Sequence, residues 1–262
     1  MFTLRVLGGF ALEGPAGTQV NHLSQRRAEA VLALLAVAGD LGCTRDRLIA
    51  FLWPESDQHR GRHSLRDSLH AIRQVLGPDV ILTGVGETLR LNPAVVTSDL
   101  QLFAQAVTTT PLADAVDAYR GPLLDGFHLG GVPEFERWLD AERSRLFQQC
   151  QEAIAKLAGE AERVNHWRVA AQWWARALGM DPFNTRVVVR RMGALARAGD
   201  RAKALKEGED HRVRLVRELE LEPDPEFLQE IERVRRGELG PPVFRTPTEG
   251  TERPWVPPKP RD

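Results

Sequence analysis

One stretch concentrates the side chains that could do chemistry, "HRGRHSLRDSLHAIRQVLG", from His59 to Gly77. Imidazole and guanidinium groups can bind metal ions, transfer protons or contact nucleic acid. The stretch holds seven such side chains and one acid, in a chain whose formal net charge is only -1: His59, Arg60, Arg62, His63, Arg66, His70, Arg73 and the acid Asp67. These residues allow three interpretations: a helix that reads DNA, a metal site built on histidines, or an amphipathic helix with a solvated basic face.

The histidine spacing allows a metal site, but the neighbouring residues argue against one. His59 and His63 are four positions apart, which places both on one helix face, as in zinc-binding helices. The zinc hydrolases of this type carry a glutamate directly after the first histidine, whereas Arg60 and Gly61 follow His59 here. The adjacent arginines would also repel a cation. We therefore expect no metal and no cofactor.

The same helix contains the residue types of a hydrolase triad, His63, Ser64 and Asp67. A triad needs its three side chains within mutual hydrogen-bond reach, whereas side chains so close in one helix fan apart. The chain also lacks the GxxxxGK[ST] phosphate loop. The sequence therefore predicts that the protein is not an enzyme and has no catalytic residues.

The periodicity of the stretch predicts an amphipathic helix with a basic edge. On a helical wheel of about 100° per residue, an apolar stripe lies within about 40° of Leu65. Its other members are Leu69, Ile72 and Leu76. The cations follow beside it, at about 60° to 160° on the same wheel: Arg62, Arg73, Arg66, His70 and His63. Such an edge suits phosphate contacts and base contacts in the major groove of DNA.

The elements around this helix give it a position in a known motif. Alternating apolar residues predict an antiparallel strand pair within residues 2–12, and helical patterns follow at 24–39 and 44–53, the second with Thr44 as N-cap. After the basic helix, "DVILTGVGETLRLN" predicts a hairpin around Val85. Three helices followed directly by a hairpin are the layout of a winged helix-turn-helix, whose third helix enters a DNA groove.

Beyond residue 98 the pattern is helical only. Helices are predicted within residues 97–107, 111–119, 133–163, 166–182 and 185–225. Ala170 and Ala204 recur at the 34-residue interval of tetratricopeptide repeats, with a second pair that is about two turns longer. We expect a mainly α protein with small β elements, in three parts. These are a winged helix-turn-helix at 1–98, an all-α tetratricopeptide-like domain at 99–236, and a Pro-rich disordered tail or linker at 237–262.

The composition of the chain indicates its cellular location and the state of its cysteines and tryptophans. The chain has no apolar run of about 18 residues and no signal-peptide pattern at its start, so we expect a cytoplasmic protein without membrane contact. Cys43 and Cys150 are expected to be buried thiols rather than a disulfide or metal pair. Four tryptophans in the helical part, Trp138, Trp167, Trp173 and Trp174, are expected in its core. The alternative places part of Trp167 or Trp174 on a groove.

The chain resembles regulators of the SARP type, named for antibiotic regulatory proteins. The first half is similar to response-regulator winged helices in "LRVLGGFALEG", "QRRAEAVLALLAVAG", "LIAFLWPES" and "LRLNP". The second half resembles the bacterial transcriptional activator domain in "YRGPLLDGFHL", "PEFERWLDAERSRL", "RALGMDPFNTRVVVRRMGALARAGDRAKAL" and "ELELEPDPE". The resemblance covers about residues 2 to 236. In "PESDQHRGRHS" the chain has His and Arg where many relatives have small residues.

The resemblance implies a transcription factor that binds double-stranded promoter DNA, often as two copies on direct repeats. The helical-repeat domain would then mediate homodimer or RNA polymerase contacts in an activator. By position, the groove-facing residues would be Arg62, His63, Arg66, His70 and Arg73. Phosphate contacts would come from Arg60, Arg45 and Arg47, and the wing would supply Thr83, Thr88 and Arg90.

Two other functions remain open at this stage. Residues 1–99 contain as many acidic as basic side chains, which favours a protein-interaction adaptor whose winged helix does not bind DNA. The tryptophans would suit a small-molecule sensor. DNA binding has the stronger argument, because the basic edge lies on the third helix of the motif.

Overall fold

The alternating residues at the N-terminus form part of a three-stranded sheet. In the computed structural model, β1 (Phe2–Arg5) pairs antiparallel with β2 (Ala11–Glu13), as predicted. A third strand, β6 (Val96–Ser98), pairs parallel with β1 on its other side. Strand β6 is not predictable from the local sequence pattern, since its partner strand lies more than 90 residues away along the chain. The structure describes residues 1–18, 20, 23, 25–108 and 111–238.

Three helices follow, as the sequence predicts. They are α1 (Arg26–Ala38), α2 (Arg45–Leu52) and α3 (Gln58–Leu76). Thr44 is the N-cap of α2, and its hydroxyl accepts a hydrogen bond from the backbone N–H of Arg47. Asp57 caps α3 in the same way through the backbone N–H of Arg60. The polar residues before each apolar pattern thus fix where α2 and α3 begin.

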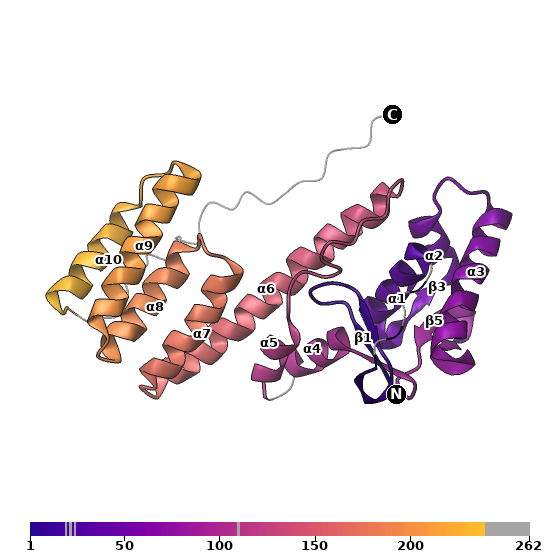
Figure 1. Cartoon of the computed structure of the whole chain (residues 1–262), viewed down its shortest axis with the longest axis horizontal. Helices are drawn as coiled ribbons and strands as arrows, with labels where there is room; N and C mark the ends of the chain where they lie inside the picture. The colour runs from indigo at the N-terminus through magenta and orange to yellow at the C-terminus, as the bar shows by residue number, and fades with distance from the viewer. Residues whose placement is uncertain (19, 21–22, 24, 109–110, 239–262) are drawn as a thin grey trace. The chain divides into compact units, whose positions relative to one another are not determined.

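The predicted hairpin after α3 belongs to a second sheet. Its strands, β4 (Ile81–Thr83) and β5 (Thr88–Leu91), pair antiparallel, and the short β3 (Cys43–Thr44) pairs with the other edge of β5. Gly42 precedes β3 at φ 65°, and a Cβ there would lie 2.6 Å from the carbonyl oxygen of Leu89. A glycine therefore lets β3 reach the hairpin. In Figure 1 the β3–β5 strands lie beside α2 and α3, completing the winged helix-turn-helix.

Gly61 allows α2 and α3 to pack closely. It is a buried residue of α3, and a Cβ at its position would lie 2.5 Å from Cγ2 of Ile49 on α2. Ile49 is itself 9% exposed, so it has little room to move. The same glycine that interrupts the basic residues of α3 thus sets the distance between the two helices.

We expect Gly61→Ala to destabilise the first unit by about 1–3 kcal/mol, although alanine is the better helix former. The overpacking against Ile49 should exceed the gain in helix propensity. Thermal unfolding followed by circular dichroism would measure the change. The double variant Gly61→Ala/Ile49→Ala, compared with Ile49→Ala alone, provides the control, because alanine lacks the Cγ2 methyl group that the new Cβ would meet. A Gly61→Ala variant as stable as the wild type would contradict this account of the packing.

Four 3-10 turns and two helices complete the described part of the first unit around these elements. The turns are η2 (Gly39–Leu41), η3 (Pro78–Val80) and η4 (Val85–Glu87), and a further one, η1 (Pro15–Gly17), follows β2. The helices are α4 (Asp99–Thr108) and α5 (Ala113–Ala118). Ser98 and Gln101 form a reciprocal capping box at the start of α4: Ser98 Oγ accepts from the N–H of Gln101, and Gln101 Oε1 accepts from the N–H of Ser98.

The long helix α6 (Pro133–Arg163) extends from one compact unit of the chain into the other. The first unit comprises Met1–Leu157 and the second Ala158–Asp262. Four more helices belong to the second unit: α7 (Trp167–Met180), α8 (Thr185–Arg197), α9 (Arg201–Leu219) and α10 (Pro225–Arg236). Within it, α7 packs on α8, α8 on α9, and α9 on α10 (Figure 1).

The predicted repeat is present in the second unit. Ala170 and Ala204 are each the fourth residue of their helix, α7 and α9, and both are fully buried. Small residues at these equivalent positions let the neighbouring helices approach. The second pair is longer, as predicted, because α9 has 19 residues and α7 has 14. The fold is thus mainly α with small sheets, and its second unit is built from helical repeats.

The compact units do not divide where the domain prediction placed a boundary, between residues 98 and 99. Helix α4 packs against α1 and β1, so it lies in the first unit although the helical pattern begins there. The division into three domains, at 1–98, 99–236 and 237–262, therefore stays a prediction. The predicted tail at 237–262 lies outside the described residues except for Gly237 and Glu238. Within the described ranges, no helix combines the length and hydrophobicity of a membrane span.

Candidate nucleic-acid interface

The basic edge of α3 faces outward because the opposite stripe is buried. Leu65, Leu69, Ile72 and Leu76 are each at most 2% exposed, and they pack into the core of the first unit. On the same helix, Arg62, Arg66 and His70 are exposed and Arg73 is half-buried. The apolar stripe thus orients the cations, as the helical wheel predicted.

Four of the predicted contact residues line one open depression on the first unit. It has a volume of about 500 Å³ and lies between α2, α3 and the turn of the hairpin. Its charged residues are Arg45, Arg62, Arg66, Arg73 and Glu87. Among the described residues, no carboxylate forms an ion pair with Arg62, Arg66 or Arg73. These three guanidiniums therefore leave their hydrogen-bond donors available to a ligand that carries negative charge.

The depression also contains an acid, Glu87, that lies outside the predicted site. Glu87 lies at the end of the hairpin turn at φ 58°, and its carboxylate is 3.7 Å from Nε of Arg45. Its side chain is 78% exposed, so this ion pair is weak. Glu87 nevertheless offsets one positive charge on this face. Glu87 lies in the depression because of the conformation of the hairpin turn. The hydrophobic periodicity of the sequence does not predict this conformation.

The remaining predicted residues of α2 and α3 lie outside this depression, and most have local partners. Arg47 stacks over Phe51, with its guanidinium carbon 5.7 Å from the ring centroid. Arg60 Nε donates a 2.7 Å hydrogen bond to the carboxylate of Asp57. His63 Nδ1 is 2.9 Å from Oδ2 of Asp67. His70 is exposed without a local partner in the described structure.

The wing residues lie on the hairpin strands. Thr83 ends β4 and Arg90 is in β5, and both are exposed, whereas Thr88 at the start of β5 is half-buried. Val85 in the turn is 98% exposed. An isolated apolar side chain at this tip suits contact with the floor of a DNA groove. The sequence pattern predicts the turn only as a connection between the strands.

His63 and Ser68 of α3 form local hydrogen bonds within the helix. His63 is held by Asp67, while the hydroxyl of Ser68, one turn after Ser64, donates to the carbonyl oxygen of Ser64. In the described part of the chain, no three His, Cys, Asp or Glu side chains come together as a metal site.

The two cysteines are buried, whereas only one of the four tryptophans expected in the core, Trp174, is buried. Cys43 and Cys150 are both buried and form no disulfide within the described chain. Burial raises the pKa of Cys43, which disfavours its thiolate. Trp174 is 7% exposed, and its Nε1 donates a 2.8 Å hydrogen bond to Glu162. Trp138 packs edge-on against Phe51.

The other three tryptophans are half-buried: Trp138, Trp167 and Trp173. Arg197 lies over the ring of Trp167, with its guanidinium carbon 5.2 Å from the centroid. Trp174 is thus a core residue, whereas Trp167 lies partly at the surface with the Arg197 guanidinium over its ring.

Comparison with known proteins places the chain among regulators. The solved structure of Mycobacterium tuberculosis EmbR in complex with a low affinity phosphopeptide is similar, with a TM-score of 0.60 and 21% sequence identity. The similarity covers 90% of this chain and 65% of that one, so the chain spans about two thirds of the relative's length. No curated protein matches the chain. The family pattern described as "Bacterial transcriptional activator domain" matches residues 98–235, more than half of the sequence. The chain therefore belongs to the bacterial transcriptional activator domain family, the family of SARP-type transcriptional regulators.

Proposed function

We propose that this regulator binds double-stranded DNA through α3 and the hairpin wing. The observation that carries the proposal is the open depression lined by Arg62, Arg66 and Arg73, whose guanidiniums have no carboxylate partner among the described residues. An α-helix fits the major groove of B-form DNA, and arginine is the side chain that most often reads guanine there. The first unit supplies both requirements on one face.

The residues divide by the contact that their position allows. Arg62 and Arg66 project from the exposed side of α3 and are assigned to base edges or the phosphates flanking them, with His63 and His70 farther along the same edge. Arg45, the first residue of α2, is assigned to a backbone phosphate, where the helix N-terminus adds its partial positive charge.

The other assigned residues surround this centre and supply backbone contacts. They are Arg47 and Arg60 near the helix starts, Arg73 toward the end of α3, and Thr83, Thr88 and Arg90 on the wing.

We also propose that the protein activates transcription through its helical repeats. The family is one of transcriptional activator domains, and the second unit offers helices for contact with RNA polymerase or with a second copy on a direct repeat. A regulator that acts in this way needs two functional surfaces. The two compact units would each supply one of them.

Selection of binding sites from random duplex DNA, followed by fluorescence anisotropy on the selected duplex, tests the DNA-binding proposal. The affinity should fall steeply as salt rises, because each neutralised phosphate releases counterions. A log–log slope of about -4 to -6 is expected if five to seven phosphates are contacted. Weak, salt-independent binding without a selected sequence would contradict the proposal. Together with a stable protein partner, that result would favour the adaptor function instead.

A further inference from the structure

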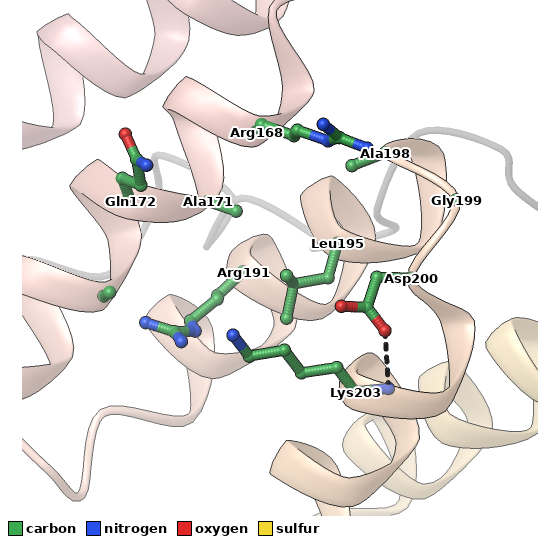
Figure 2. A pocket seen from close by; sticks show the side chains of 10 residues that line it. Arg168, Ala171, Gln172, Arg191, Leu195, Ala198, Gly199, Asp200 and Lys203 are labelled. Carbon is green, nitrogen blue, oxygen red and sulfur yellow. Dashed lines mark hydrogen bonds between the residues drawn. The ribbon is translucent and has the colours of Figure 1, made fainter.

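An open groove of about 500 Å³ lies on the surface of the second unit (Figure 2). Helix α7 provides one wall with Arg168 and Gln172, α8 contributes Arg191 and Leu195, and the start of α9 closes it with Asp200 and Lys203. All of these residues belong to the same unit. The groove is therefore a feature of the helical repeats themselves, and it is separate from the basic edge of α3.

The charged residues of the groove are mainly cationic, and two of them are available. Arg168 and Lys203 are exposed, and neither side chain has a partner within the described structure. Arg191 is held in place by Glu207, with Nη2 2.6 Å from Oε1, and its side chain is 15% exposed. Figure 2 shows Arg168 on the α7 side of the groove and Lys203 on the α9 side. A ligand lying across the groove would thus meet separate positive charges from opposite walls.

The acid in the groove is already used by the fold. Asp200 is the N-cap of α9, and its Oδ1 accepts a 3.2 Å hydrogen bond from the backbone N–H of Lys203, drawn as a dashed line in Figure 2. This hydrogen bond keeps the carboxylate at the end of the helix. Within the described residues, the groove thus presents two unpaired cations, Arg168 and Lys203, beside the Arg191–Glu207 ion pair and the Asp200 carboxylate, whose position is set by capping.

The apolar lining indicates what kind of anion would fit. Between the cations lie small or aliphatic side chains from α7, from α8 and from the C-cap of α8: Ala171, Ala175, Leu195 and Ala198. Such a surface accepts the main chain and short side chains of an extended peptide without a steric barrier. The Gln172 amide beside it can both donate to and accept from a peptide backbone. A single phosphate would need cations that converge on one point, whereas these come from opposite walls.

We infer that this groove binds an acidic, extended segment of a partner protein, with carboxylates paired to Arg168 and Lys203. The inference goes beyond DNA binding and does not depend on it. The inference places the proposed protein contacts of the helical repeats in this groove. It also assigns the partner a negatively charged segment that complements the charge of the groove.

The test uses the full chain and a fluorescein-labelled peptide of alternating glutamate and alanine as the probe. Anisotropy at low salt should show saturable binding, and the matching peptide of glutamine and alanine should bind at least about tenfold more weakly. The double variant Arg168→Gln/Lys203→Gln should lose about tenfold in affinity for the acidic peptide. Both residues are exposed, so the folded structure should be retained, which circular dichroism would verify.

Matched variants separate the groove from general charge effects. Arg186→Gln/Lys206→Gln removes one exposed arginine and one exposed lysine from α8 and α9 outside the groove, and it should bind the peptide as the wild type does. Arg62→Gln/Arg66→Gln should also leave peptide binding unchanged while it weakens DNA binding. A loss of peptide binding in either of these two variants would overturn the inference.

Two further outcomes would also overturn it. The first is the absence of any peptide binding at low salt. The second is a fall in DNA affinity in Arg168→Gln/Lys203→Gln, which would assign the groove to nucleic acid. The DNA-binding proposal is tested separately by the response of DNA binding to Arg62→Gln/Arg66→Gln, so the two ideas can fail independently.

Discussion

Replacing Arg62 and Arg66 together by alanine is expected to weaken binding to the selected DNA by about 2–6 kcal/mol, since an arginine that contacts a base contributes about 1–3 kcal/mol. Both side chains line the depression beside α3, and neither has a carboxylate partner among the described residues, so neither is engaged by the fold before DNA binds. Anisotropy on the selected duplex, with a mutated duplex beside it, measures the loss. Discrimination between the two duplexes should fall together with affinity.

The control for this variant removes the same charge elsewhere. Arg163→Ala/Arg186→Ala deletes two exposed arginines of the second unit that have no described partner, and it should alter DNA affinity by less than about twofold. An equal loss in both double variants would show that overall charge drives binding. Full affinity in Arg62→Ala/Arg66→Ala would remove α3 from the interface.

The basic edge could be predicted because it depends on one helix only. The apolar stripe that begins at Leu65 has a helical period over 12 residues, and any helix that buries this stripe must expose Arg62 and Arg66. The helix starts were predictable for a similar reason, since Thr44 caps the residues directly after it. Such features need no knowledge of the tertiary fold.

The features that the sequence did not reveal all depend on residues brought together from a distance. Glu87 joins the arginine-lined depression only because the hairpin turn reaches it. The requirement for glycine at position 61 comes from Ile49 on another helix, and β6 needs β1 as its partner. A pattern within a single segment carries no information on these contacts. The groove of the second unit is of the same kind, because three helices supply its cations and its apolar lining.

Removing the carboxylate of Asp99 is expected to have the largest effect on stability. This side chain lies in the first turn of α4, but it extends back to the end of strand β1. There it accepts hydrogen bonds from the backbone N–H groups of Val6, at 3.0 Å, and Leu7, at 2.9 Å. Asp99 is 8% exposed, so these hydrogen bonds are shielded from bulk water.

Asp99→Ala leaves two buried N–H groups without an acceptor and should cost about 2–5 kcal/mol. Thermal unfolding of the first unit, followed by circular dichroism, would show this as a drop of roughly 5–15 °C. Asp114→Ala is the matched control, since Asp114 is exposed in the first turn of α5. A change no larger than in this control would show that the hydrogen bonds from Val6 and Leu7 contribute little.

The pH dependence of an asparagine variant distinguishes the charge of Asp99 from its hydrogen bonds. Burial raises the pKa of Asp99, and this effect exceeds the opposing effect of the N–H groups of Leu7 and Val6. The folded state therefore binds the proton more tightly than the unfolded chain, whose aspartate pKa is about 3.9. The contribution of Asp99 to the free energy of unfolding should then rise as the pH falls from the raised pKa of the folded state toward the pKa of the unfolded chain. Asp99→Asn cannot titrate at this position, so the stability difference between wild type and variant should grow on acidification. A difference that shrinks instead would mean that the hydrogen bonds to the ionised carboxylate outweigh the cost of burying its charge.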